Sequence, residues 1–190
     1  MDSAVALVQA YLRVNGYLTV TEYPVVEATR YGAPRALTDL DVLAFRFPGA
    51  GRLVGERFVT DPALRCPSEA PDMLIGEVKE GNAELNRAGR DPAVLTAALA
   101  RFGCCGPAHA AETVRELLRH GQATTGHGHR VRLVVFASAG EVPHVLTVHL
   151  ARVIDFLRDY VRESWAELLA GRPKDPALDW IVIEEKARRG

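Results

Sequence analysis

The sequence has no surplus of basic residues: 23 lysines and arginines stand against 24 aspartates and glutamates, for a formal net charge of −1. A protein that grips a phosphate backbone usually carries a basic surplus, because neutralised phosphates supply most of its non-specific affinity. If nucleic acid is the ligand, the basic residues must therefore gather on one face. Otherwise bound cations or a partner subunit must supply the positive charge.

Cysteines are few, and no apolar run is long. Cys66 and the adjacent pair Cys104 and Cys105 form no C-x-x-C unit and cannot all pair, which fits a reducing compartment better than a disulfide framework. No apolar run is long enough to span a bilayer, and the first residues lack a basic segment followed by a signal core. The sequence thus predicts a cytoplasmic protein with no membrane segment.

Several common catalytic motifs are missing. The chain has no Gly-rich phosphate loop ending in Lys-Ser or Lys-Thr, no dinucleotide fingerprint and no G-x-S-x-G. These patterns hold nucleotide phosphates or present an activated serine. Nucleotide-driven motors, dehydrogenases and α/β hydrolases therefore have no support in the sequence.

The apolar pattern predicts an alternation of helices and strands. With 190 residues, 48% of them hydrophobic, the chain is long enough for one domain with a good core, and we expect a single domain over residues 1–190. Helices that alternate with strands predict an α/β fold with a mixed central sheet flanked by helices. The expected elements are a helix at 3–14, strands at 17–28, 38–47 and 72–80, helices at 91–102 and 107–120, a strand at 131–137, and a long helix at 149–170 before a short tail.

Three segments are less regular. Residues 145–148 are a further candidate strand, because they are short and β-branched. Residues 122–129 are rich in Gly, Thr and His and are expected to form a loop. Residues 175–186 fit a helix by their start and a strand by the run that follows, so both alternatives stay open.

Charged residues interrupt the second and third expected strands. Glu77 and Lys79 are two positions apart, so in a strand they project from one face about 6–7 Å apart while Val78 packs behind. Asp41 enters an otherwise largely apolar run, where an unpaired carboxylate costs several kcal/mol unless it binds a partner or a cation. A bound metal ion would explain these acids.

Two other aspartates are rivals of Asp41. Asp72 follows a proline and gives a literal "PD", but it precedes Glu77 by five residues on one strand, so the two point to opposite faces. We therefore exclude Asp72 as a ligand. Asp39 shares the parity of Asp41 but lies nearer the open end of its strand, where solvation is easier.

Asp41 and the triplet Glu77-Val78-Lys79, each on an apolar strand with a helix before and after, resemble the PD-(D/E)XK nuclease superfamily, which includes type II restriction enzymes and Holliday-junction resolvases. The resemblance covers about the first half of the chain and implies a restriction-endonuclease-like core of order α-β-β-β-α-α-β-α. It implies Mg²⁺ or Mn²⁺ held by Asp41, Glu77 and the Val78 backbone carbonyl. Lys79 then positions the nucleophile or stabilises the pentavalent phosphate. The chain departs from the pattern in that no proline precedes Asp41, the connection to Glu77 is long, and the first helix offers only Gln9 where some members have an acid.

The function implied by this resemblance is a metal-dependent nuclease that hydrolyses phosphodiester bonds of DNA, acting as a homodimer or with a partner protein. By their position beside the strand ends, the expected nucleic-acid contacts are Arg30, Arg35, Arg52 and Arg57. The neutral charge also fits a catalytically inactive nuclease-fold module that binds nucleic acid or assembles with a protein. A third alternative is that Glu77 and Lys79 form an ordinary charge pair on the solvated face of a sheet.

Other polar clusters have simpler interpretations. The histidines at 120, 127 and 129 have the side chains to bind a transition metal, but the glycines and threonines around the last two indicate an exposed loop. The adjacent cysteines lack a basic or redox context and are expected to be idle thiols. The arginines of the 149–170 helix alternate with acids, which is typical of a solvated face.

Overall fold

The structure is a computed structural model that describes residues 2–27, 35–50, 60–171 and 174–190. Within these residues it contains six strands and six α-helices, which confirms the predicted α/β class with a mixed sheet. The α-helices are α1 (Ser3–Val14), α2 (Pro92–Phe102), α3 (Pro107–His120), α4 (Leu150–Glu163), α5 (Trp165–Ala170) and α6 (Pro176–Arg189). The strands are β1 (Leu18–Glu27), β2 (Arg35–Arg46), β3 (Asp72–Asn82), β4 (Gln122–Thr124), β5 (Arg130–Ala139) and β6 (Leu146–His149), and short 3-10 turns are η1 (Pro62–Leu64) and η2 (Ala88–Arg90).

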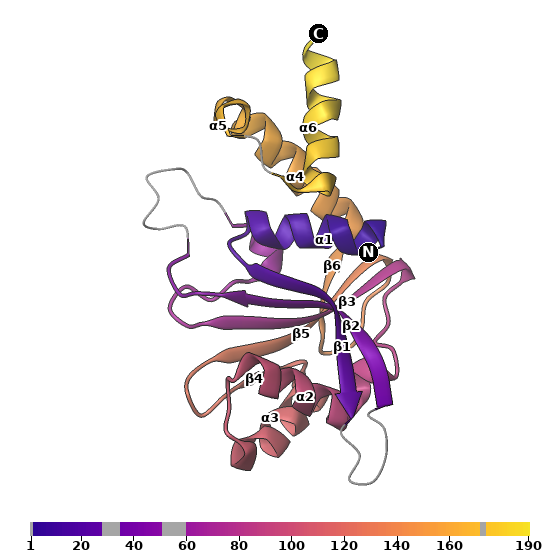
Figure 1. Ribbon diagram of the computed structural model, residues 1–190, viewed down its shortest axis with the longest axis vertical. Coiled ribbons are helices and arrows are strands. Elements are labelled where there is room, and N and C mark those ends of the chain that lie inside the picture. Colours follow the sequence, from indigo (N-terminus) through magenta and orange to yellow (C-terminus); the bar gives the residue numbers. More distant parts are fainter. Residues whose placement is uncertain (1, 28–34, 51–59, 172–173) are drawn as a thin grey trace.

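The sheet has the order β1-β2-β3-β5-β4, and β6 also pairs with β5. The first three strands form an antiparallel meander, whereas β5 runs parallel to β3 and β6 runs parallel to β5. Parallel neighbours need a crossover connection, and α2 and α3 lie in the crossover from β3 to β5. β3 therefore lies inside the sheet, between an antiparallel and a parallel neighbour (Figure 1).

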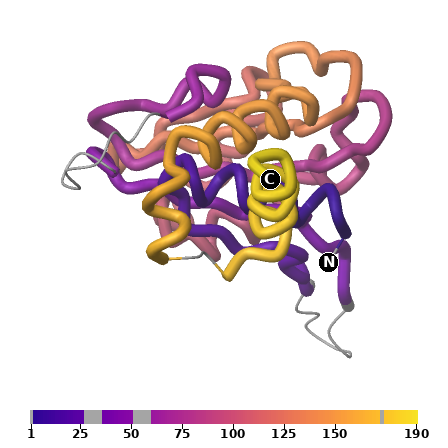
Figure 2. Tube along the Cα trace, turned by 90° about the horizontal axis from the view of Figure 1, so that it is seen from above, coloured from indigo at the N-terminus to yellow at the C-terminus, as the bar shows by residue number. Residues whose placement is uncertain are grey.

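Helices cover both faces of this sheet. α1, α4 and α6 contact one another on one side, where Val8, Leu12, Phe136 and Leu157 belong to one buried cluster. α2 and α3 lie on the opposite side with a second cluster (Figure 1). Figure 2 views the first side from above and shows α6 end-on beside α4. In the part of the chain that the structure describes, every helix is too short or too polar to span a bilayer.

Local capping residues explain why two predicted helices have nearly the predicted bounds. The Asp91 side chain accepts the Ala93 N–H at the start of α2, and Pro92 occupies the first turn, where its missing N–H costs nothing. Gly103, with φ of 65°, ends that helix in the left-handed conformation that favours glycine. Gly121 ends α3 in the same way, with φ of 68°.

The prediction of one long helix at 149–170 is wrong, because the chain breaks between α4 and α5 at Ser164. The Ser164 N–H bonds to the Tyr160 carbonyl, while the Ser164 carbonyl accepts from Leu168. Serine competes with the helical backbone for hydrogen bonds and is a weak helix former. The change of direction places Leu168 in the core, at 6% exposure, and leaves Leu169 exposed.

Two further expectations also need correction. The residues expected to form a short tail are the helix α6, so of the two alternatives left open for residues 175–186 the helix is confirmed. Asp175 caps this helix by accepting from Ala177 and Leu178. Ion pairs from Arg188 to Glu184 and from Arg189 to Glu185, each four residues apart, support it. The expected loop at 122–129 begins with β4, which pairs antiparallel with β5 but is too short to show an alternating pattern.

Candidate active site

The sheet is irregular at Asp41. β2 pairs with β3 as far as Val42 opposite Gly76. On the other side of β2, Thr21 and Tyr23 of β1 pair with Val42 and Leu40, but Glu22 and Asp41 between them do not pair. Glu22 has a φ of 51°, which is uncommon for a residue other than glycine. In the middle of β2, pairing with β3 thus ends next to Asp41, and pairing with β1 skips Asp41 and then resumes.

The Asp41 carboxylate lies against the middle of the Glu77-Val78-Lys79 triplet. Its Oδ2 accepts a hydrogen bond of 2.8 Å from the Val78 N–H. In an antiparallel pair, two opposite residues exchange both of their backbone hydrogen bonds, so the N–H and C=O of one residue point to the same side of the strand. The Val78 carbonyl therefore faces the same opening between β2 and β3 as the Asp41 carboxylate.

Glu77 and Lys79 project side by side, as their spacing predicts. The Lys79 Nζ lies 2.6 Å from the Glu77 Oε1. The Glu77 side chain is only 7% exposed, whereas that of Lys79 is 26% exposed. Val78 packs behind them against the cluster that α1 and α4 cover. The alternative of an ordinary charge pair on a solvated face is therefore wrong for Glu77, because its carboxylate is buried.

The electrostatics of this cluster favour an added positive charge. Burial raises the pKa of Glu77, and the charge of Asp41 raises it further, although Lys79 opposes both effects. Burial likewise raises the pKa of Asp41 against the stabilising Val78 N–H, and Asp2 and Glu22 add to the rise. Burial lowers the pKa of Lys79, but the hydrogen bond and charge of Glu77 outweigh it, so the net pKa is raised and the ammonium form is kept.

These groups fit a hard divalent cation. Carboxylate and carbonyl oxygens are the ligands that Mg²⁺ and Mn²⁺ prefer, and Mg²⁺ keeps several waters, so few protein ligands suffice. Across the described ranges no group of three or more His, Cys, Asp or Glu side chains is arranged to hold a metal. The donors that fit are therefore Asp41, Glu77 and the Val78 carbonyl, which are the ligands that the family resemblance implies.

Replacing Glu77 with Gln is expected to raise the melting temperature of the metal-free protein at neutral pH. The folded-state pKa lies above the ordinary value, so the ionised carboxylate destabilises the fold at pH values above that pKa, and Gln removes this cost. As the pH falls through the folded pKa, the wild-type carboxylate protonates and the difference should shrink. Thermal melts in chelator at several pH values, beside Glu80→Gln at an exposed neighbour, measure this. A variant that melts below wild type at neutral pH would contradict it.

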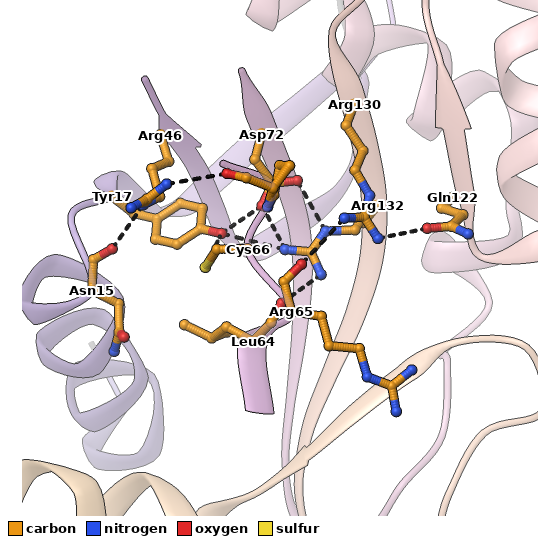
Figure 3. Close-up of polar contacts among 11 residues, drawn as sticks. Asn15, Tyr17, Arg46, Leu64, Arg65, Cys66, Asp72, Gln122, Arg130 and Arg132 are labelled. Carbon is orange, nitrogen blue, oxygen red and sulfur yellow. Dashed lines mark hydrogen bonds and ion pairs between the residues drawn. The ribbon is translucent and has the colours of Figure 1, made fainter. Parts of the chain in front are cut away.

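Asp72 takes part in a different site at the other end of β3. It is fully buried and accepts from the Arg132 Nε at 3.0 Å, from Arg132 Nη2 and from the Tyr17 hydroxyl (Figure 3). Arg132 also donates to the Leu64 carbonyl at 2.7 Å. Asp72 is thus occupied by a buried ion pair, which supports its exclusion as a metal ligand. Asp39, the other rival, is exposed.

The remaining candidates do not form catalytic groups in the described part of the chain. The rings of His127 and His129 lie 6.0 Å apart without a further metal-binding side chain. Burial raises the pKa of the Cys104 thiol to about 12, which makes it a poor nucleophile. Arg152 is not merely solvated, because it donates to the buried Asp61 at 2.8 Å.

Most of the predicted nucleic-acid contacts fall outside what the structure describes. Arg30, Arg52 and Arg57 lie outside the described residues, and for Arg35 only the backbone, at the start of β2, is described. Sequence reasoning missed the buried polar network instead. Its signal was Arg132, an arginine within the apolar run of β5, because such a residue needs a buried acid as partner.

Comparisons with protein-family models, with curated proteins and with solved structures find no match for this chain. The geometry of its own residues is the ground for a functional proposal.

Proposed function

We propose that this protein is a metal-dependent nuclease that hydrolyses phosphodiester bonds of DNA, with a site of the PD-(D/E)XK type. The observation that carries the proposal is the 2.8 Å bond from the Val78 N–H to Asp41, because it joins the isolated acid to the centre of the Glu77-x-Lys79 triplet. The buried Glu77, the half-buried Asp41 and the Lys79 ammonium group thus meet where the pairing of β2 with β3 ends. A solvated charge pair does not require this arrangement.

The protein groups have separate roles in the proposed reaction. When bound, a Mg²⁺ or Mn²⁺ ion would bind the scissile phosphate and acidify the attacking water. Asp41, Glu77 and the Val78 carbonyl would hold that ion. The raised pKa keeps Lys79 protonated, so it acts as a hydrogen-bond donor and fixed positive charge rather than as a base. It would orient the water or stabilise the charge that develops on the phosphate.

The arrangement of elements supports the same proposal. The chain begins with a helix, three antiparallel strands and two helices, and then returns to a strand parallel to β3. This is the order that the family resemblance implies, with β4, β6, α5 and α6 as additions. We propose that β1, β2, β3 and β5 form the restriction-endonuclease-like core.

The proposed DNA contacts must lie on one side of the protein, because the formal net charge of −1 gives no general attraction to phosphates. Arg30 and Arg35 lie in and just after the connection of β1 to β2, and Arg52 and Arg57 follow β2. We propose that these arginines bind the DNA backbone. Each contact that is lost should weaken binding uniformly across sequences and reduce its salt dependence.

Calorimetric titration with Mn²⁺ tests the proposed metal site. We expect one binding site per chain. Loss of a residue that only supports a metal ligand typically weakens metal binding by roughly 10- to 100-fold. Asp41→Asn and Glu77→Gln each change a proposed ligand, so each should weaken Mn²⁺ binding by more than that. Glu80→Gln, at the exposed neighbour, should leave binding unchanged. Equal binding in all four proteins, or none in any, would contradict the assignment.

A second candidate function is a nuclease-fold module that has no catalytic activity and assembles with a protein. It is favoured by the apolar side chains that α5 and α6 expose, since Leu169 is 61% and Trp180 is 72% exposed. Apolar side chains gathered on a surface mark interaction sites. Such a module would show no metal affinity at Asp41 and Glu77, so the same titration separates the two candidates.

A further inference from the structure

A second site lies at the outer edge of β5, away from the proposed active site. β4 pairs with the first residues of β5 and β6 with later ones, and a pocket of about 450 Å³ lies against these strands. Its lining includes the three arginines at 65, 130 and 132. Arg130 is aligned with Asp72, five residues before Glu77, which corresponds to about 16 Å along the strand. The pocket is therefore distinct from the metal site.

The pocket holds an arginine, Arg130, that forms no ion pair with an acid among the described residues. Arg132 is paired with Asp72, but the Arg130 guanidinium donates to two neutral acceptors, the Gln122 Oε1 at 2.8 Å and the Arg65 carbonyl at 3.2 Å (Figure 3). Burial lowers the pKa of Arg130 and the charge of Arg132 lowers it further, and these effects outweigh the opposing charge of Asp72. An anion in the pocket would relieve this repulsion.

Arg65 adds a second cation that is available to a ligand. Its backbone has a φ of 48°, and its side chain points away from the Asp72 cluster in Figure 3. Among the described residues no acid forms an ion pair with Arg65, whose side chain is exposed. Arg65 and Arg130 thus line one pocket, and among the described residues neither forms an ion pair with an acid.

The rest of the pocket fits the body of a small molecule. Leu133 and Leu146 give it an apolar wall, and Glu141 offers a carboxylate at the lining. Gly121, with φ of 68°, allows the 141–147 segment to close the pocket, because a Cβ there would lie 2.2 Å from the His144 carbonyl oxygen. The volume lies within the usual range for small-ligand sites.

We propose that this pocket binds an organic phosphate of mononucleotide size. The phosphate lies between Arg65 and Arg130, because guanidinium groups bind phosphate oxygens through charge-assisted hydrogen bonds. Glu141 accepts a hydroxyl of the attached sugar, and the apolar wall covers the rest of the ligand. A bare phosphate lacks these last contacts and binds more weakly.

Calorimetric titration in chelator tests the proposal with adenosine 5′-monophosphate, inorganic phosphate and adenosine as probes. The mononucleotide should bind at one site, inorganic phosphate more weakly, and adenosine weakest. Arg65→Gly removes the cation while it suits the left-handed backbone, so its melting temperature should not fall. It should weaken mononucleotide binding by about tenfold or more, as should Arg130→Gln, because each removes a charged hydrogen bond.

Controls separate this site from others. Arg115→Gln, at an exposed arginine of α3 outside the pocket, and Glu77→Gln, at the proposed metal site, should both bind like wild type. A 5′-phosphorylated oligonucleotide beside its unphosphorylated form shows whether the ligand is a free nucleotide or a nucleic-acid end. Absence of mononucleotide binding at millimolar concentration, inorganic phosphate binding as tightly, or binding that survives Arg65→Gly would each overturn the proposal.

Discussion

Glu77→Gln should reduce metal-dependent DNA cleavage on the order of a thousandfold or more, while the protein stays folded. The substitution keeps the size of the side chain but removes a negative charge from a buried group that faces Asp41 and Lys79. The neutral amide of Gln is a weaker ligand for a divalent cation than a carboxylate, because it carries no negative charge. Single-turnover cleavage rates at saturating Mg²⁺ and Mn²⁺ measure the loss.

Lys79→Met should reduce the rate of DNA cleavage by a similar factor, but for a different reason. It removes the positive charge 2.6 Å from Glu77 but leaves both acids in place, so metal binding is expected to persist while the rate falls. Glu80→Gln changes an exposed acid of the same strand and should cut like wild type. Wild-type rates in either Glu77→Gln or Lys79→Met would remove these residues from the mechanism.

Arg132→Met should destabilise the protein by about 3–5 kcal/mol, the largest stability effect that we expect. The substitution leaves Asp72, which is fully buried, without its guanidinium partner and takes a donor from the Leu64 carbonyl. The Tyr17 hydroxyl still donates to Asp72 but carries no charge. An uncompensated buried charge accounts for most of the cost.

Chemical denaturation compares this variant with two controls. Arg158→Gln breaks a partly exposed pair with Glu184 on α6 and should cost no more than about 1 kcal/mol. The double variant Asp72→Asn/Arg132→Met should recover part of the loss, because no charge is then left unpaired. If Arg132→Met costs no more than Arg158→Gln, the buried pair does not have the structural role assigned to it.

The parts of the fold that could be predicted from the sequence are those with strong local signals. Gly103 and Gly121 end two helices at the expected residues, and the apolar strands of the sheet lie where their composition placed them. The break at Ser164 could not be predicted, because the apolar spacing continues across it and the burial of Leu168 decides the direction of the chain. β4 has only three residues and exists because β5 pairs with it.

The same limit applies to the candidate site. Strand parity alone placed Glu77 beside Lys79, which the 2.6 Å contact confirms. The bond from Val78 to Asp41 depends on the register of two strands that are far apart in the sequence, so spacing could not supply it. The buried pair of Asp72 and Arg132 joins residues 60 positions apart and was missed for the same reason.

Cleavage of labelled single-stranded, duplex and branched DNA, and of RNA, with Mg²⁺, Mn²⁺ or chelator tests the central claim most directly. The proposed site predicts cutting of at least one DNA substrate that requires the metal and is lost in Glu77→Gln. The pattern across the substrates would identify the one that is cut fastest. Inactivity of the folded wild-type protein on every substrate with either metal would contradict the nuclease and favour the module that assembles with a partner.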